Sequence, residues 1–243
     1  NEGKYGPLLN NLGIKVYCLN MKANIFSIFS IFRLVKILML LKPDIVQTWL
    51  IHGDFIGGIA ARLAGIKNVI WNVRYSKLEI VKTKISSILL IKLLSKLSFL
   101  IPKLIIVVSK SAKKNCKNLS YSKKKLFLIP NGYDLSILNP SKTKRIFIRK
   151  KWKIKKQIPV IGNVARYDPK KDHMNLLNAL SLIRLRNIDF FCILAGSNID
   201  KKNKILVSEI KRLNLGKYVK LLGQKKDISQ VMNGLDIYVQ SSS

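Results

Sequence analysis

The chain has 243 residues, 48% of them hydrophobic, so it can bury a core and is not an intrinsically disordered protein. Its 45 basic and 12 acidic residues give a formal net charge of +33, which fits affinity for nucleic acid, anionic lipid or phosphorylated substrates. The cations are mostly scattered lysines, which favours the alternative of a lysine-rich composition spread over solvated surfaces. No stripe of arginine and aromatic residues indicates a dedicated nucleic-acid binder, so we expect no specific nucleic-acid partner.

In the first half, short apolar runs typical of buried strands alternate with longer helical patterns. Strands are predicted at 14–19, 44–50, 68–73, 103–109 and 125–132, with helices at 26–42, 54–66, 78–100 and 110–119. Strand, helix, strand at these spacings predicts βαβ units and a parallel sheet that is buried on both faces.

The helix predicted at 78–100 is apolar enough to suggest a membrane, but lysines interrupt it at positions 82, 84, 92 and 96. Such charges make a transmembrane span costly. Two interpretations stay open. The helix either lies at an anionic membrane surface with its lysines at the headgroups, or is a buried crossover helix with an exposed basic edge.

Residues 133–157 are polar, basic and irregular and predict a connector with a short helix at 143–152. Beyond it the alternation resumes, with strands predicted at 158–165, 188–196, 218–223 and 236–240 and helices at 173–186, 201–215 and 227–235. We therefore predict an α/β fold of two Rossmann-like, doubly wound domains facing a cleft, both incomplete. The expected parts are an N-terminal domain at 1–140, a linker at 141–157 and a C-terminal domain at 158–243.

The cysteines and histidines form no recognisable metal or disulfide motif. Cys18, Cys116 and Cys192 are odd in number and far apart, which fits reduced thiols in the cytoplasm better than a disulfide framework. The sequence contains no HExxH motif and no D-x-D motif that could hold a divalent cation at a substrate diphosphate. We expect neither a metal nor a cofactor.

In open α/β sheets, ligands bind beyond the carboxyl ends of the strands. The loops predicted at these ends span residues 48–54, 74–77, 109–110, 130–134, 166–173, 196–200 and 223–227. The stretch IGNVARYDPKKDH, residues 161–173, is the most informative of them. Arg166 follows a strand that contains Gly162, and Lys171 stands at the start of a predicted helix. Two cations at a helix N-terminus predict an anion site that suits a diphosphate, and a solvated turn is the alternative.

Glycines at two other strand ends, Gly196 and Gly223, would let a ligand approach the backbone closely, although each is weak evidence alone. Neither the GxGxxG fingerprint of dinucleotide-binding proteins nor the GxxxxGK[ST] motif of P-loop proteins occurs. A nicotinamide- or flavin-dependent oxidoreductase and a P-loop enzyme are therefore disfavoured.

The ordered series IPNGYD, IGNVARYDPKKDH, FFCILAG, VKLLGQKKDI and MNGLDIYVQSSS resembles the nucleotide-sugar glycosyltransferases of family 4, which have the GT-B fold. Residues 46–76 resemble the branch that builds bacterial surface polysaccharides, and the resemblance runs from about Gly6 to Ser243. It implies a retaining, hexosyltransferase-type enzyme that moves a sugar from a nucleoside diphosphate to a saccharide or lipid-linked saccharide, without metal. It also implies a cytoplasmic protein, peripheral on the inner face of the membrane.

Matching positions carry the implied roles. Arg166 and Lys171 match the residues that hold the donor diphosphate and stabilise the leaving nucleoside diphosphate. The backbone near the nucleotide is expected at Gly162, Gly196 and Gly223, and the crevice between the domains at Arg74, Asn131 and Gly132. His52 matches a histidine of the surface-polysaccharide branch, with a catalytic and a structural role both open.

The chain departs from the family pattern in three places. No Gly-rich loop precedes Asn1, Arg74 and Tyr75 stand where many members have a histidine, and the Glu-x7-Glu motif is not reached before Ser243. The resemblance therefore implies a fragment truncated at both ends that is inactive alone. A non-catalytic basic α/β protein that binds nucleic acid or membrane, and a dead pseudo-enzyme, are the alternatives.

Overall fold

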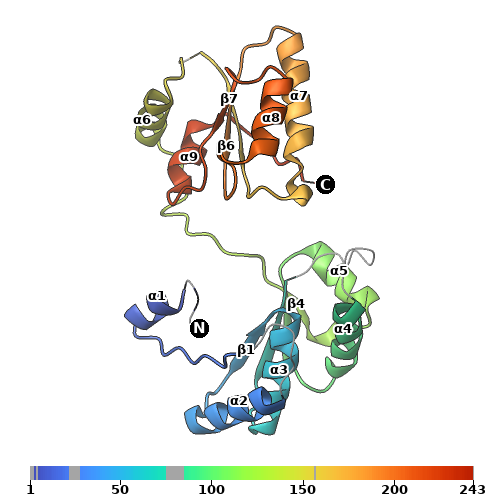
Figure 1. The fold of residues 1–243 in the computed structure, drawn as a ribbon. Helices are drawn as coiled ribbons and strands as arrows, with labels where there is room; N and C mark the ends of the chain where they lie inside the picture. Colours follow the sequence, from blue (N-terminus) through green and yellow to red (C-terminus); the bar gives the residue numbers. More distant parts are fainter. Residues whose placement is uncertain (1–2, 4, 22–27, 75–84, 156, 243) are drawn as a thin grey trace. The chain divides into compact units, whose positions relative to one another are not determined.

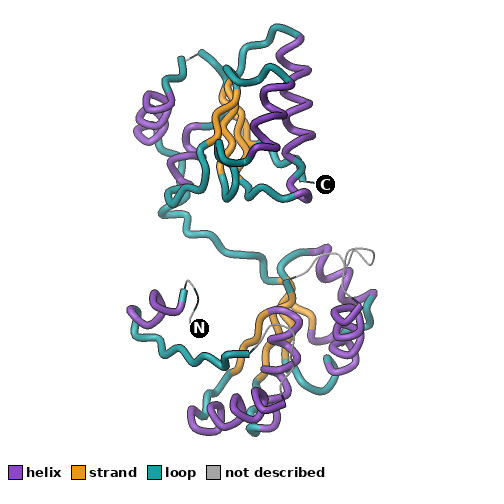
Figure 2. Tube along the Cα trace, viewed as in Figure 1, coloured by secondary structure: helices purple, strands orange, loops and turns teal. Residues whose placement is uncertain are grey.

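The computed structural model describes residue 3 and residues 5–21, 28–74, 85–155 and 157–242. The chain divides into two compact units, Asn1–Gly132 and Tyr133–Ser243, called here the N-terminal and C-terminal units (Figure 1). Each has its own parallel sheet with helices packed against it (Figure 2). This confirms the predicted fold class of two Rossmann-like α/β domains.

The sheet of the N-terminal unit has the order β1-β2-β3-β4, and all its pairings are parallel. Its strands are β1 (Val46–Trp49), β2 (Val69–Val73), β3 (Leu104–Val107) and β4 (Leu126–Leu128). Its helices are α1 (Gly6–Asn11), α2 (Ile28–Leu41), α3 (Leu50–Leu63), α4 (Ile85–Leu97), α5 (Lys110–Asn118) and the 3₁₀ turn η1 (Lys123–Lys125). The crossovers β1-α3-β2 and β2-α4-β3 place α3 and α4 on one face of the sheet, where α2 also contacts α3.

Small residues let α3 approach the sheet closely. Trp71 of β2 is fully buried, and a Cβ atom added to Gly58 would lie 2.8 Å from its indole nitrogen. Ala61, three residues on and also fully buried, continues the same side of the helix. The small-residue stretch of α3 therefore makes room for the tryptophan in the core.

The C-terminal unit contains the second parallel sheet, in the order β7-β6-β5-β8. Its strands are β5 (Val160–Val164), β6 (Phe191–Ala195), β7 (Val219–Leu221) and β8 (Ile237–Tyr238). Its helices are α6 (Lys142–Trp152), the 3₁₀ turn η2 (Pro169–Lys171), α7 (His173–Leu185), α8 (Lys204–Arg212) and α9 (Ile228–Gly234). Helices α7 and α8 cover one face and α6 and α9 the other (Figure 1). The strand order reverses between β5 and β8, which makes their carboxyl ends a topological switch point.

Helix α6 belongs to the core of the C-terminal unit. Its buried Ile148 and Trp152 pack on α9, and a Cβ atom added to Gly234 would overlap the Trp152 ring. Arg149 of α6 donates to the Gly234 carbonyl oxygen at 3.0 Å and pairs with Asp236, which directly precedes β8. The boundary between units therefore falls at Gly132/Tyr133, whereas the sequence predicted it at residue 140 with a linker at 141–157.

Two sequence predictions were wrong. Residues 14–19 form no strand, because no strand of the described residues pairs with them, and Ile14 and Tyr17 are about half exposed. The helix predicted to begin at residue 54 begins at Leu50, so 48–54 is not a strand-end loop. A left-handed φ of 69° at Leu50 turns the chain directly from β1 into α3. Residues 75–84, which include part of the helix predicted at 78–100, lie outside the described residues.

Candidate functional site

A buried carboxyl group lies below the carboxyl ends of β1 and β2 in the N-terminal unit. The Thr48 hydroxyl at the end of β1 donates to Asp54 Oδ1 of α3 at 2.5 Å, and both side chains are buried. Burial raises the pKa of Asp54 to about 6, although hydrogen bonds from the Thr48 side chain and the Asn72 backbone lower it in part. The pair joins the first turns of α3 to the sheet.

Arg74 connects two loops that are distant in sequence. Its Nε donates to Asn72 Oδ1 at 3.1 Å, and its Nη1 donates to Asn131 Oδ1 at 2.6 Å. Thus Arg74 and Asn131, both predicted at one crevice, do meet at the carboxyl edge of this sheet. Gly132 follows directly, and a Cβ atom there would touch nothing, so local packing does not require glycine.

His52 is exposed on the first turn of α3, two residues before the buried Asp54. Residues two apart lie on nearly opposite sides of a helix. The imidazole is therefore on the solvent side of α3, at the same edge of the sheet as Arg74.

In the C-terminal unit, the predicted cations follow β5. Arg166 contacts the Asp168 carboxylate through two nitrogen atoms, Nε at 3.1 Å and Nη2 at 3.0 Å. The Arg166 side chain is 71% exposed. Asp168 also accepts a hydrogen bond from the Lys170 backbone, and this bond is the main cause that holds the pKa of Asp168 below its ordinary value. Because such exposed ion pairs are weak, Arg166 remains available to an anionic ligand.

Lys171 ends η2, directly before the N-cap of α7. The Ser241 hydroxyl, which follows β8, donates to the Lys171 carbonyl oxygen at 2.8 Å. Asp172 adopts a left-handed conformation with φ 45° and accepts from the Asn175 backbone at 3.2 Å, which caps α7. Thus a residue that follows β8 fixes the turn that carries Lys171, at the switch point of the sheet. Ser241 has no predicted role in the sequence, where it appears only within a run of three serines.

A second residue without a predicted role is His173, the first residue of α7. It is 2% exposed, its ring lies 5.7 Å from that of Tyr167, and neither of its ring nitrogens has a partner among the described residues. Burial lowers its pKa, so the imidazole is neutral at pH 7. An unpartnered buried polar group costs about 1–3 kcal/mol, which a hydrogen bond from water or a ligand would offset.

The fold itself requires glycine at the three positions that were predicted near the nucleotide. A Cβ atom at Gly196 would overlap the Ala165 carbonyl oxygen, and its φ is +151°. At Gly162 it would overlap the Leu235 side chain, and Gly223 has a left-handed φ of +67°. The Gly196 amide donates to the Gly223 carbonyl oxygen at 2.9 Å. Close packing explains Gly162 and Gly196, and the left-handed backbone explains Gly223, in each case without a ligand.

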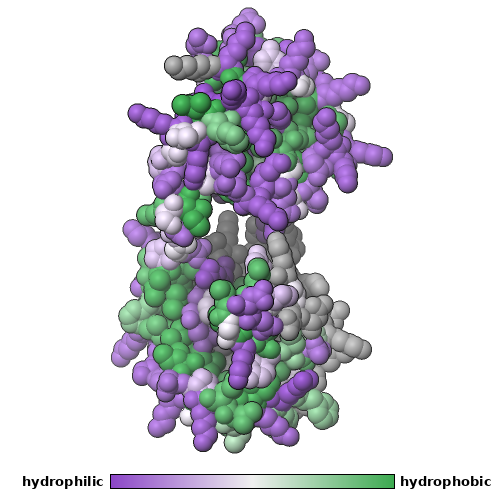
Figure 3. All heavy atoms as spheres, turned by 90° about the vertical axis from the view of Figure 1, so that its left-hand side faces the viewer, coloured by the Kyte–Doolittle hydropathy of each residue, from purple (hydrophilic) through white to green (hydrophobic). Residues whose placement is uncertain are grey.

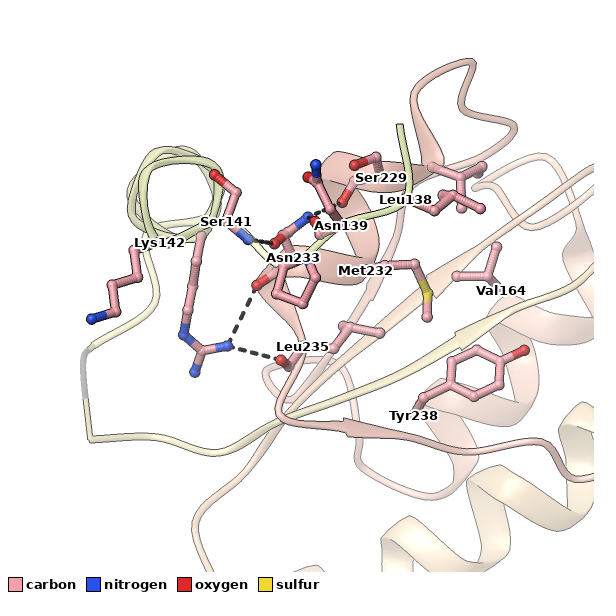
Figure 4. A pocket seen from close by; sticks show the side chains of 13 residues that line it. Leu138, Asn139, Ser141, Lys142, Val164, Ser229, Met232, Asn233, Leu235 and Tyr238 are labelled. Carbon is pink, nitrogen blue, oxygen red and sulfur yellow. Dashed lines mark hydrogen bonds between the residues drawn. The ribbon is translucent and has the colours of Figure 1, made fainter. Parts of the chain in front are cut away.

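The C-terminal unit also contains a largely apolar cavity of about 620 Å³ (Figure 4). Its polar groups bond to one another: the Ser141 amide donates to Asn233 Oδ1 at 2.6 Å, and Asn233 Nδ2 donates to the Asn139 carbonyl oxygen at 3.1 Å. The apolar part of the wall comes from Leu138, Pro140, Val164, Ile228, Met232, Leu235 and Tyr238. None of the predicted site residues lines this cavity, although Val164 at the end of β5 does.

The described residues contain no group of three or more histidine, cysteine or acidic side chains that could hold a metal ion. All three cysteines are free thiols, and burial raises the pKa values of Cys116 and Cys192 to about 12. Among the helices of the described residues, none is both long enough and apolar enough to cross a membrane.

Comparison with known families shows which protein family the chain belongs to. A model described as Glycosyltransferase Family 4 matches residues 5–137, and one described as Glycosyl transferases group 1 matches residues 144–243. The chain belongs to glycosyltransferase family 4. A similar curated protein is the Escherichia coli UDP-Gal:alpha-D-GlcNAc-diphosphoundecaprenol alpha-1,3-galactosyltransferase, which is 30% identical over 216 residues. The match covers 88% of this chain and 55% of the relative, so this family 4 chain spans about half the relative's length.

Solved structures agree with the GT-B fold predicted for a family 4 member. HepE from Anabaena in complex with UDP is 20% identical, with a TM-score of 0.84 over 99% of this chain and 64% of HepE. A glycosyltransferase from Rickettsia africae, also 20% identical, has a TM-score of 0.77 and covers 99% of this chain and 62% of its own. At this identity the likeness shows the fold, and the roles of individual residues stay predictions.

Proposed function

We propose that the protein is part of a retaining glycosyltransferase that moves a sugar from a nucleoside diphosphate to a saccharide or lipid-linked saccharide acceptor in surface polysaccharide synthesis. The observation that carries the proposal is the turn between β5 and α7, which contains both Arg166 and Lys171 and in which Ser241 fixes the Lys171 backbone. Support comes from the E. coli relative, named for a UDP-sugar donor and a diphosphoundecaprenol acceptor, and from HepE, whose structures contain UDP and UDP-glucose.

The donor diphosphate would bind at this turn. The planar guanidinium of Arg166 suits two phosphate oxygens, and Lys171 adds a point charge beside the positive end of the α7 dipole. Each charge-assisted hydrogen bond contributes roughly 1.5–3 kcal/mol, more than an exposed ion pair such as Arg166–Asp168, so a diphosphate can displace Asp168. As the glycosidic bond to phosphate breaks, negative charge grows on the leaving group. These cations would stabilise it, and the proposal includes no metal and no cofactor.

The acceptor would bind at the carboxyl edge of the N-terminal sheet. Arg74, Asn72 and Asn131 form a joined polar cluster there, and His52 is exposed on the adjoining turn of α3. Guanidinium and amide groups can hydrogen-bond saccharide hydroxyls. His52 is the candidate catalytic residue of this unit.

We also propose that the 243-residue chain binds the donor without turning it over. Its glutamates are Glu2, Glu79 and Glu209, and no two of them have the spacing of a Glu-x7-Glu pair. Sugar transfer by the purified chain would contradict this part of the proposal. A cytoplasmic location at the inner face of the membrane follows if the acceptor is lipid-linked.

Calorimetric titration of the chain with UDP tests the diphosphate site. Arg166→Ala and Lys171→Ala should each weaken UDP binding at least about tenfold, the value of one charge-assisted hydrogen bond. Lys170→Ala is the matched control, since it removes one cation from the same turn, and it should change the affinity less than about twofold. Equal losses in all three variants would mean that general positive charge binds UDP, and no binding to the unaltered chain would overturn the proposal.

A further inference from the structure

The buried imidazole of His173 has no role yet in the proposed chemistry. Figure 3 shows hydrophilic residues over much of the visible surface of the C-terminal unit, whereas His173 is only 2% exposed. Neither of its ring nitrogens has a partner among the described residues, so the protein supplies no hydrogen bond that would stabilise the imidazole there. The contact that its ring makes is therefore the feature to explain.

The ring of His173 packs against the other end of its own turn. Its centroid lies 5.7 Å from that of Tyr167, and the two ring planes are tilted by 34°. Tyr167 directly follows Arg166, and His173 stands two residues after Lys171. The ring contact therefore joins the two ends of residues 166–173, beside both candidate diphosphate cations.

Both rings are attached to fixed parts of the C-terminal unit. The Tyr167 amide donates to the carbonyl oxygen of Ser197, in the loop after β6, at 2.9 Å. His173 is the first residue of α7, directly after the N-cap Asp172. The contact between the rings therefore holds the turn between the β6 loop and the start of a helix.

The two cations need such support. Arg166 is exposed, and the bond from Ser241 holds the backbone of Lys171 but not its side chain. Arginine and lysine side chains each carry about 2 kcal/mol of rotamer entropy, part of which is lost when they bind. A turn that already holds both cations at a suitable spacing binds a diphosphate more tightly, because less ordering remains to be done.

We propose that the Tyr167–His173 contact holds this turn in the shape that binds a diphosphate, so that both are positioning residues for Arg166 and Lys171. The inference rests on the proposed function, because it requires the donor diphosphate to bind at this turn. Neither ring has to touch the ligand. The role requires a neutral imidazole, since an imidazolium would place an unpaired charge in a buried site.

The surroundings of His173 favour the neutral form. Burial is the main cause that lowers its pKa, the Asp172 carboxylate raises it, and the charge of Lys171 lowers it further. Strand β5 carries no charged residue. Helix α8, which contacts α7, has the charged residues Lys204, Glu209, Lys211 and Arg212, and Glu209 pairs with Arg212. The rest of the turn adds Arg166, Asp168 and Lys170. Protonation of His173 would therefore oppose the closed turn, and UDP binding should weaken toward acid pH.

A double-mutant cycle, measured by calorimetric titration with UDP at pH 7.5, tests the proposal. His173→Ala and Tyr167→Ala should each weaken UDP binding about tenfold, because either change removes the contact. His173→Phe keeps a ring against Tyr167 and should stay within about twofold of the unaltered chain. In a Lys171→Ala background, the loss from His173→Ala should shrink to about threefold or less, since one of the cations that it positions is gone.

Tyr218→Ala is the matched control. It removes a partly buried tyrosine of the same unit from another aromatic contact, with Phe190 at 5.2 Å between ring centroids. It should change UDP affinity less than about twofold, and circular dichroism checks that each variant folds. Unchanged affinity in both His173→Ala and Tyr167→Ala, an equal loss in Tyr218→Ala, or an undiminished loss in the Lys171→Ala background would overturn the positioning role. An unaltered chain that does not bind UDP would overturn the proposed function and this inference with it.

A pH series separates positioning from direct contact. UDP itself titrates, but equally in both measurements, so the ratio of the affinities of the unaltered chain and His173→Phe isolates the imidazole. This ratio should fall between pH 7.5 and pH 5, by up to about tenfold for each pH unit below the pKa of His173. A ratio that rises toward acid pH would mean that an imidazolium contacts the diphosphate, and the positioning role would be wrong.

Discussion

Replacing Asp54 with asparagine tests whether the N-terminal unit buries an ionisable carboxyl group below its candidate acceptor site. The raised pKa means that the folded chain holds this proton more tightly than the unfolded chain does. The free energy of unfolding therefore falls as the pH rises from 3.8, the ordinary pKa, to about 6, the pKa in the folded chain. At roughly 1.4 kcal/mol per pH unit, ionised Asp54 costs about 3 kcal/mol at pH 7 relative to pH 3.8.

Asparagine keeps an oxygen for the Thr48 hydroxyl but cannot ionise. Its amide group has the wrong polarity for the Asn72 backbone bond, so the variant can be less stable than the unaltered chain at acid pH. The prediction concerns the difference between the two proteins. The unfolding free energy of Asp54→Asn, relative to the unaltered chain, should rise by about 2–2.5 kcal/mol between pH 4 and pH 7, because the unfolded carboxyl is already more than half ionised at pH 4.

Urea unfolding followed by tryptophan fluorescence measures this difference. A Trp152→Phe background removes the buried tryptophan of the C-terminal unit. It leaves the half-exposed Trp49 and the fully buried Trp71, both of which report on the N-terminal unit. Asp44→Asn is the control, because it removes an exposed carboxylate from the same unit. A stability difference that stays flat from pH 4 to pH 7 would refute the reasoning, since it would mean that Asp54 ionises in the folded chain as it does in water.

Three further changes test local geometry. Gly196→Ala should destabilise the C-terminal unit by about 1–3 kcal/mol in urea, because the methyl group overlaps the Ala165 carbonyl oxygen, and an unchanged midpoint would contradict this contact. Leu50→Gly should raise the unfolding free energy by about 0.5–1 kcal/mol by relieving a left-handed leucine, whereas Leu50→Ala should not, and equal effects would rule out backbone strain. Ser241→Ala should weaken UDP binding about three- to tenfold and Ser241→Thr should restore it. Full affinity in the alanine variant would show that this bond does not position Lys171.

Local patterns predicted most of the fold, and distant contacts account for what they missed. Continuous apolar runs located the strands from residue 44 onward, because burial on both faces leaves that pattern in the sequence. Residues 14–19 have the composition of a strand, but a strand also needs a neighbour to pair with. The early start of α3 depends on a left-handed leucine, a conformation that leucine seldom adopts.

In the candidate sites too, local patterns predicted some features and distant contacts account for the rest. The spacing of Arg166 and Lys171 around a Pro turn predicted two cations near a helix start. In the structure Lys171 directly precedes the N-cap of α7, and Arg166 pairs with Asp168 earlier in the same turn. The Ser241–Lys171 bond joins residues 70 apart and leaves no local signal. The burial of Asp54 and His173 depends in turn on how α3 and α7 pack, which periodicity alone does not give.

The hydrogen bonds between α6 and Asp236, which precedes β8, have a practical consequence for exchanging the C-terminal unit between family members. Asp236 accepts hydrogen bonds from Arg145, Arg149 and the Val160 amide, so one carboxylate joins α6, β5 and β8. A chimaera joined at residue 157 would separate these arginines from their own carboxylate and would place a foreign side chain in the slot that Trp152 fills. A chimaera is better joined just after Gly132, because α6, Asp236 and β5 then all come from the same parent protein.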